Sequence, residues 1–313
     1  MDIDRPTIDI LMATFNGEAW VGAQLESLLQ QTCDDWRILA RDDASSDGTV
    51  AVLEDFAAKH PQRISIQRNE ANLGVISTYN LLMQASGAPY LMLCDQDDVW
   101  LPEKVAKTLE DMRQAEALYG NDMPLLVHTD LVVADCDLNP ISDSLWAFQK
   151  SDPAGGNGLN RVLLQNQVTG CTCMFNRALL ETALPLPEGA LMHDWWLALC
   201  AVAFGRIEQV PEATMLYRQH GQNELGAEKW GWQRFLNLTA NSDRSRQGIR
   251  KTWRQAQIFH DRFAVRLGKE DAALIAAWAD MGHIDKVARI WALFRNGFFY
   301  HGLLRNLGLL LLV

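Results

Sequence analysis

The chain has 313 residues, enough for one sizeable domain with an appendage or for two small domains. With 48% hydrophobic and 21% charged residues it has an ordinary globular composition, and no apolar run reaches the roughly 18 residues of a membrane span. The net charge of -11 hides an asymmetry, because residues 1–225 carry 14 Lys+Arg against 32 Asp+Glu, whereas residues 226–313 carry 14 against 7. A basic end favours an anionic partner, membrane or polyanion, unless those side chains merely solvate helix faces.

The six cysteines show no metal-type pairing with histidine, and Cys94 and Cys200 lie inside apolar runs. Buried thiols in a reducing compartment are therefore expected. Residues 1–5 are acidic and polar, unlike the start of a signal peptide. These features predict a protein that folds in the cytoplasm.

Over the first 120 residues, short apolar runs alternate with segments of helical spacing. The apolar runs predict strands over 8–13, 36–40, 64–67 and 90–94. Each strand is followed by a predicted helix, over 20–29, around 52–56, over 76–85 and over 102–118. Strands that alternate with helices of this length predict right-handed crossovers and a parallel sheet.

Beyond residue 120 the alternation loosens. Strands are predicted over 125–133, 168–175 and 207–210, with a helix over 195–204. Residues 152–158 contain proline and three glycines and predict an exposed loop. From Trp230 onward the pattern is helical to the end of the chain.

The most informative segment follows the fourth predicted strand, where Asp95, Asp97 and Asp98 fall within four positions. On an extended backbone Asp95 and Asp97 project to the same side, with Gln96 pointing away, and such carboxylates repel each other unless a cation lies between them. Mg²⁺ or Mn²⁺, which also takes phosphate oxygens from a nucleotide diphosphate, suits this arrangement. The alternative is a solvated turn before the helix that Pro102 opens. Placement after a buried strand favours the metal site, because open parallel sheets bind ligands beyond the carboxyl ends of their strands.

Two other predicted strands end in polar or aromatic residues. The first delivers Thr14 and Phe15, and the second delivers Asp42 and Asp43. A carboxylate there can accept the imide N–H of uracil or thymine, and an aromatic ring can cover the base. Turn chemistry before a helix would also explain the aspartates, but two carboxylate-bearing ends on one edge favour nucleotide binding. The chain has neither a Gly-x-Gly-x-x-Gly fingerprint nor a P-loop, which argues against a dinucleotide fold and a P-loop NTPase.

Several motifs occur in an order that resembles a known family. They are TFNG at 14–17, DDASSDGT at 42–49, NLG at 72–74, DQDD at 95–98, VTG at 168–170, HDWW at 193–196 and YRQHGQN at 217–223. The order resembles the nucleotide-sugar half of family 2 glycosyltransferases. The DQDDVW, HDWW and YRQHGQN forms are similar to bacterial rhamnosyltransferases that build surface polysaccharides from dTDP-L-rhamnose. The resemblance implies an α/β GT-A domain over 1–225, a Rossmann-like, mixed and mostly parallel sheet flanked by helices, with a helical C-terminal region over 226–313.

The resemblance also implies roles for individual residues. Asp42 would bind the base, Asp95 the ribose, and Asp97 the divalent cation on the diphosphate. His220 matches a family histidine that completes the metal or diphosphate site. The other residues expected at the nucleotide-sugar site are Thr14, Phe15, Asn72 and Arg218, the last beside the leaving diphosphate.

Asp194 is the candidate catalytic base. In an inverting transfer the acceptor hydroxyl attacks the anomeric carbon while a carboxylate accepts its proton. The alternative is a helix cap, a role that aspartate favours. His193 could tune this carboxylate, and of Trp195 and Trp196 one is expected in the core and one under the sugar ring, because adjacent helical residues diverge.

The last 25 residues, 289–313, interleave Arg289, Arg295 and Arg305 with aromatics and leucines. This mixture suits a segment lying in a membrane interface, and the alternative is an ordinary helix docked on the domain. A lipid-linked acceptor would explain a basic, membrane-facing end.

The sequence thus predicts an inverting, metal-dependent glycosyltransferase. Its partners would be a nucleotide-sugar donor, a saccharide or lipid-linked acceptor and the inner face of the cell membrane, with no nucleic acid. One alternative is a nucleotidyltransferase that makes a sugar nucleotide, although residues 13–17 lack the Gly-rich, basic phosphate loop usual in that class. The other is a non-catalytic, sugar-nucleotide-binding scaffold at the membrane.

Overall fold

The computed structural model describes residues 7–151, 158–221 and 242–313. The chain divides into two compact units. The sheet unit comprises Met1–Leu145, Val168–Leu186 and Gly205–Ala227, and the helical unit comprises Trp146–Gln167, Pro187–Phe204 and Glu228–Val313. The domain boundary predicted at residue 225 falls in the segment 222–241, outside the described residues.

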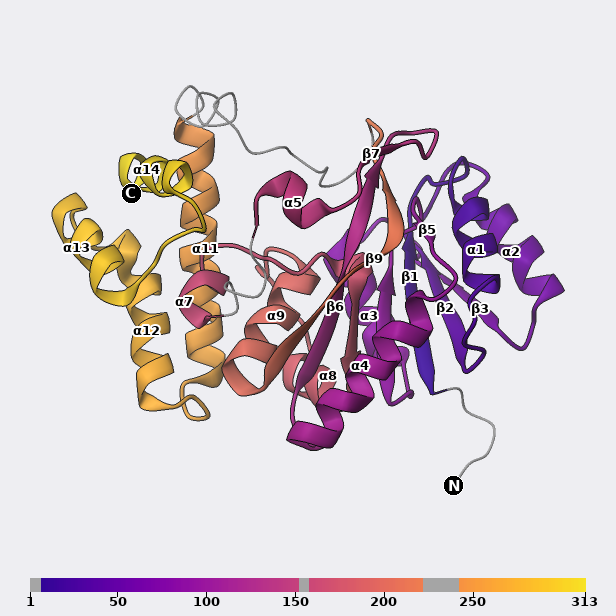
Figure 1. The fold of residues 1–313 in the computed structure, drawn as a ribbon, viewed down its shortest axis with the longest axis horizontal. Helices are drawn as coiled ribbons and strands as arrows, with labels where there is room; N and C mark the ends of the chain where they lie inside the picture. Colours follow the sequence, from indigo (N-terminus) through magenta and orange to yellow (C-terminus); the bar gives the residue numbers. More distant parts are fainter. Residues whose placement is uncertain (1–6, 152–157, 222–241) are drawn as a thin grey trace. The chain divides into compact units, whose positions relative to one another are not determined.

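The sheet unit is built on one nine-stranded sheet, with the order β3-β2-β1-β4-β8-β6-β9-β5 and β7 paired to β6 (Figure 1). Its first four strands are β1 (Ile8–Thr14), β2 (Trp36–Asp42), β3 (Ile64–Arg68) and β4 (Tyr90–Cys94). All the pairings among these four strands are parallel. These pairings confirm the predicted parallel strands. β1 and β4, in the middle of the sheet, are buried on both faces, as their near-continuous apolar runs suggest.

The remaining strands make the sheet mixed. They are β5 (Val99–Trp100), β6 (Leu125–Ala134), β7 (Pro140–Ser142), β8 (Cys173–Asn176) and β9 (Arg206–Arg218). β8 runs antiparallel to both β4 and β6, whereas β9 runs parallel to β6. β5 closes the sheet antiparallel to β9.

Two of these later strands differ from the sequence prediction. β9 is far longer than the predicted 207–210, because the β6–β9 ladder skips from Val210 to Ala213 and then continues. Pro211 lies in the skipped segment and has no N–H to donate, which favours an irregularity of this kind. The predicted strand over 168–175 is instead a 3-10 turn, η1 (Gly170–Thr172), followed by β8. The Thr172 hydroxyl donates to the Thr169 carbonyl at 2.7 Å, which helps to hold the turn.

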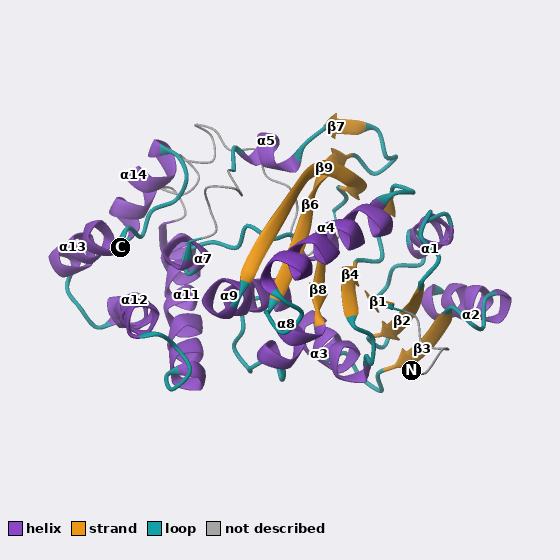
Figure 2. Cartoon of the chain, turned by 60° about the horizontal axis from the view of Figure 1, so that its bottom comes forward, coloured by secondary structure: helices purple, strands orange, loops and turns teal. Residues whose placement is uncertain are grey.

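The helices that the structure describes in the sheet unit are α1 (Val21–Leu29), α2 (Thr49–Lys59), α3 (Val75–Ala85), α4 (Lys104–Tyr119) and α8 (Arg177–Ala183). α3 packs on β1 and β2, and α4 packs on β6, β8 and β9 (Figure 2). Each predicted helix of the first 120 residues is present. The parallel strands thus point their carboxyl ends to one edge, where the loops before α1, α2, α3 and α4 begin.

The helical unit contains α7 (Leu159–Val162), α9 (His193–Phe204), α11 (Ser242–Phe263), α12 (Lys269–Ala279), η2 (Asp280–Gly282), α13 (Lys286–Asn296) and α14 (Leu303–Leu312). It also contains α5 (Leu145–Gln149), except for Leu145, which belongs to the sheet unit. Trp196 of α9 packs edge-on against Phe259 of α11, with ring centroids 5.2 Å apart. The helical prediction from Trp230 onward is met over 242–312, and residues 230–241 lie outside the described part. No helix in the described part of the chain is both long and apolar enough to span a bilayer.

Candidate functional site

Three loops meet at the carboxyl edge of the parallel strands. Thr14 at the end of β1 lies in register with Asp42 at the end of β2. Met12 of β1 pairs with Cys94 at the end of β4, so Asp95 leaves the sheet beside the first loop. The predicted convergence of polar strand ends on one edge is therefore confirmed.

Asp42 is fully buried and holds the first two loops together. Its carboxylate accepts hydrogen bonds from the Thr14 hydroxyl at 3.1 Å, the Ser45 N–H at 2.9 Å and the Ser45 hydroxyl at 2.5 Å. Asn16 and Ala44, one in each loop, have φ values of 47° and 63°. Non-glycine residues rarely adopt this conformation, which persists where surrounding contacts enforce it, often at functional sites. The role of Asp42 in base binding stays a prediction.

Asp43 has a positioning role that the sequence reasoning left unassigned. Its carboxylate accepts the Asn69 side-chain amide and the backbone N–H groups of Leu73 and Gly74, each at 2.8 Å. These bonds hold the turn that carries Asn72, which is exposed. Two features of the sequence could have indicated this role: Asp43 directly follows Asp42, and the NLG motif occurs at 72–74.

Gln96 joins the first loop to the acidic loop after β4. The Phe15 N–H donates to its side-chain oxygen at 2.9 Å, and its amide nitrogen donates to the Phe15 carbonyl at 3.0 Å. A Cβ at Gly17 would lie 2.2 Å from the same oxygen, so a larger residue there would displace the Gln96 side chain. The Phe15 ring remains 45% exposed. Gln96 and Asp97 form a turn, so the prediction of an extended backbone through Asp95 and Asp97 was wrong.

Asp97 and His220 form a close pair. His220 Nε2 lies 2.8 Å from Asp97 Oδ2, and the two side chains are only 9% and 14% exposed. The residues are 123 positions apart, so the fold brings together the two predicted metal ligands. β9 delivers His220, because the strand continues past Pro211 to Arg218.

Arg218 and Trp20 surround this pair. The Arg218 Nε–H donates to the Asp97 carbonyl at 2.9 Å, and its Nη1–H donates to the Cys136 carbonyl at 2.5 Å. The Trp20 ring stacks on the His220 imidazole at 5.0 Å with an interplanar angle of 14°, and the Arg218 guanidinium lies 4.7 Å from the Trp20 ring centroid. Sequence reasoning missed Trp20, for which the only signal was an aromatic residue just before α1.

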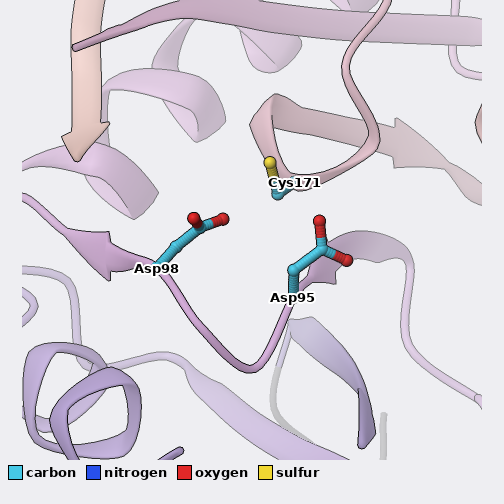
Figure 3. Close-up of side chains that lie close together, drawn as sticks. All are labelled: Asp95, Asp98 and Cys171. Atoms are coloured by element: carbon cyan, nitrogen blue, oxygen red, sulfur yellow. The ribbon is translucent and has the colours of Figure 1, made fainter. Parts of the chain in front are cut away.

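Asp95 and Asp98 point toward Cys171 of the η1 turn (Figure 3). One potential ligand atom from each of the three residues lies within 4.8 Å of the others. Burial and the nearby Asp97 carboxylate raise the pKa of Asp95 to about 6. Burial, then Asp97 and Asp95, raise the pKa of Asp98 well above its ordinary value. Burial also raises the pKa of the Cys171 thiol, so it stays protonated and is a poor metal ligand.

The acidic loop fits a hard divalent cation. After burial, repulsion from the Asp97 carboxylate is the next cause that raises the pKa values of Asp95 and Asp98, and a bound cation would relieve it. Asp97 offers a carboxylate oxygen and His220 an imidazole nitrogen from neighbouring positions, and both are ligands suited to Mn²⁺. Lys104, the buried cation near this cluster, has its pKa lowered to about 8 by burial.

Asp194 lies in the helical unit, at the second residue of α9, which begins two residues before the predicted start. It is 8% exposed, and its Oδ1 accepts the Trp195 N–H at 2.6 Å. Burial lowers the pKa of the adjacent His193 to about 3, so this imidazole is neutral at physiological pH. Trp196 is fully buried, whereas Trp195 is half-buried and its Nε1–H donates to the Val162 carbonyl at 2.6 Å.

Known proteins resemble this chain in sequence and in fold. Residues 9–121 match the family model described as glycosyl transferase family 2. The dTDP-rhamnosyl transferase RfbG of Shigella flexneri is 26% identical over 261 residues, which cover 79% of this chain and 82% of RfbG.

Two solved structures share the fold. TarS 1–349 of S. aureus in complex with UDP-GlcNAc matches with a TM-score of 0.58 and 15% identity, over 93% of this chain and 80% of that one. The mannosyltransferase PcManGT of Pyrobaculum calidifontis, in complex with GDP-Man and Mn²⁺, matches with a TM-score of 0.57 and 16% identity, over 98% and 79%. These likenesses confirm the GT-A fold. Residues 9–121 therefore carry a glycosyl transferase family 2 domain, and the chain as a whole is similar to a dTDP-rhamnosyl transferase.

Proposed function

We propose that this glycosyltransferase moves L-rhamnose from dTDP-L-rhamnose, with inversion, onto a saccharide or lipid-linked oligosaccharide during surface polysaccharide synthesis. The Asp97–His220 pair, at the edge where three strand-end loops converge, is the observation that carries the proposal. The choice of rhamnose rests on the similarity to the Shigella rhamnosyl transferase and on the HDWW and YRQHGQN forms.

The sheet unit would bind the donor. The exposed Phe15 ring is available to cover the base, and the Asp95 carboxylate can accept a ribose hydroxyl. Asp97 and His220 would hold a Mg²⁺ or Mn²⁺ ion, whose chemistry is to neutralise charge on the diphosphate. Arg218, anchored to the Asp97 carbonyl, adds positive charge near the leaving group.

Asp194 would act as the catalytic base. Its carboxylate accepts the proton of the acceptor hydroxyl as that oxygen bonds to the anomeric carbon and the bond to the diphosphate breaks. The transition state has oxocarbenium character, as in glycoside hydrolysis, and the anomeric configuration inverts in this single displacement. Neutral His193 beside it adds no positive charge that would weaken this base.

A lipid-linked acceptor places the reaction at a bilayer. We therefore propose that the enzyme works in the cytoplasm, peripherally attached to the inner face of the cell membrane. The basic balance of residues 226–313, with 14 Lys+Arg against 7 Asp+Glu, supports this location.

Transfer assays with labelled sugar nucleotides test the proposal. We expect product from dTDP-L-rhamnose plus a lipid-linked acceptor extract, loss of product with EDTA, and weaker or no transfer from UDP-glucose or GDP-mannose.

Asp194→Asn should lower turnover at least about 100-fold while donor affinity stays near normal, because the amide cannot accept the proton. Single-turnover transfer within about tenfold of the original protein, roughly 1.4 kcal/mol in barrier, would exclude Asp194 as the base. Pyrophosphate release from dTTP and a sugar phosphate would instead support the nucleotidyltransferase.

A further inference from the structure

The last two helices each expose a stripe of large apolar side chains. On α13, Val287, Trp291 and Phe294 are 78%, 60% and 63% exposed. On α14, Leu303, Leu307 and Leu311 are 85%, 51% and 53% exposed. Their spacing of i, i+4, i+7 or i+8 places the three residues of each set on one helix face. We call these six residues the apolar stripes.

Each of these helices is also held by buried side chains outside the stripes, and of the stripe residues Phe294 contacts the Phe299 ring, with centroids 5.1 Å apart. Leu293 of α13 and Leu309 of α14 are buried, as is Phe298 between the helices, whose ring lies 4.8 Å from that of Trp278. The Asn160 side-chain amide donates to the Gly297 carbonyl at 2.8 Å. Each helix therefore has one apolar face toward the helical unit and a second toward solvent, whereas an ordinary surface helix is polar on its outer face.

The charges around the stripes select the partner. Residues 286–313 contain four basic residues and no aspartate or glutamate; of the four, Lys286 and Arg295 are exposed, Arg289 is half-buried and Arg305 is buried. The guanidinium of Arg295 lies 4.8 Å from the ring centroid of Trp291. Aromatic and leucine side chains interleaved with arginine are typical of helices that lie in the interface of an anionic bilayer.

We propose that α13 and α14 form a membrane-docking surface, on which the apolar stripes enter the interface of an anionic bilayer while the neighbouring basic side chains contact lipid head groups. A second copy of the chain would also cover apolar side chains, but two copies would bring together two segments of the same positive charge. The inference goes beyond glycosyl transfer, because it rests on the stripes and their charge and holds for any donor.

Vesicle co-sedimentation of the full-length protein, without donor or acceptor, tests the surface. One set of vesicles contains phosphatidylglycerol and phosphatidylethanolamine, and the other contains phosphatidylcholine alone. We expect binding to the anionic vesicles at low salt and only partial release at high salt, because salt screens the charges but not the apolar insertion. Failure to bind anionic vesicles at low salt would overturn the proposal.

Point variants separate the stripes from general effects. Trp291→Glu, Phe294→Glu and Leu307→Glu together should lower vesicle affinity at least tenfold, and all three side chains are exposed, so the fold should persist. Leu118→Glu, at an equally exposed leucine of α4, is the matched control and should bind like the original protein. A milder variant, Lys286→Gln with Arg295→Gln, should lose mainly the salt-sensitive part of the binding. Circular dichroism and thermal melting confirm folding of each variant.

The results distinguish the possible occupants. Undiminished vesicle binding by the triple variant would refute the stripes as the docking surface. An original protein that is dimeric on gel filtration and does not bind vesicles, paired with a monomeric triple variant, would assign the stripes to a second copy of the chain. Failed sugar transfer with intact vesicle binding would count against the proposed donor chemistry alone.

Discussion

Asp97 and His220 lie 123 positions apart, yet their side chains approach to 2.8 Å. The acidic loop after β4 supplies the first, and the end of β9 supplies the second. Arg218 fixes the backbone of this loop, since its Nε–H donates to the Asp97 carbonyl and its own N–H donates to Asp98 at 3.2 Å. Single residues at this point thus control both ligand chemistry and loop position.

Asp97→Ala tests ligand chemistry alone. The variant should lose Mn²⁺-supported binding of dTDP while its melting temperature changes little, because Arg218 holds the loop through the Asp97 backbone carbonyl, which alanine retains. Isothermal titration calorimetry with dTDP, with and without Mn²⁺, measures this. Glu54→Ala, an exposed carboxylate on α2, is the control and should bind normally. An unchanged affinity in Asp97→Ala would remove Asp97 from the metal site.

At the scale of elements, the loop between β1 and α1 connects the whole edge. Its backbone N–H groups donate to Gln96 and Ser45, which belong to the other two loops, and to Thr49, the first residue of α2. The loop also carries Trp20 to the His220 imidazole and the Arg218 guanidinium. Through Trp20, an element that touches both halves of the site can position His220.

Trp20→Ala and Trp20→Phe test this positioning role. Stacking and cation–π contacts are worth about 1 kcal/mol, so Trp20→Ala should weaken Mn²⁺-dependent dTDP binding roughly five- to tenfold. Trp20→Phe keeps an aromatic face and should restore most of the affinity. Calorimetry with and without Mn²⁺ separates the two cases. Equal affinity in the original protein and Trp20→Ala would show that the stack does not orient His220.

At the scale of the whole molecule, buried titratable groups couple stability to pH. His128 in the middle of β6 is buried, and burial lowers its pKa to about 4. The folded pKa lies below the unfolded value of about 6.5, so protonation favours the unfolded chain. The stability associated with neutral His128 is complete above pH 6.5 and falls as the pH drops toward 4. Asp95, whose pKa is raised to about 6, has the opposite effect on stability, because its protonation in the folded state becomes favourable as the pH falls through that value.

A comparison with His128→Gln isolates this contribution. Between pH 8 and pH 5, the titration of His128 should lower the unfolding free energy of the original protein by about 2 kcal/mol. His128→Gln lacks this effect. The gap, which is the unfolding free energy of the original protein minus that of the variant, should therefore be smaller at pH 5 than at pH 8 by that amount. Urea unfolding at the two pH values measures both gaps. His283→Gln, at an exposed histidine, should show the same gap at both pH values. A constant gap for His128→Gln would mean that this histidine does not titrate on unfolding.

The C-terminal helices show how local pattern and tertiary packing divide the information. The sequence left open whether 289–313 docks on the protein or on a membrane. The structure shows that Leu293 and Leu309 dock inward while the apolar stripes face outward, so one segment has both faces. Helical periodicity predicts where the helices lie. It does not predict which of their apolar faces other helices cover, because that depends on tertiary packing.

By itself, the sequence determined the first four strands, their helices and the polar residues at the strand ends, because periodicity and turn residues act over a few positions. The order of its motifs also predicted the resemblance to family 2 glycosyltransferases, whose model matches residues 9–121. Only the tertiary structure revealed the length of β9, the turn at Gln96–Asp97 and the roles of Asp43, Gln96 and Trp20. These features depend on contacts between residues such as Gln96 and Phe15, 81 positions apart, and local periodicity carries no information about such contacts.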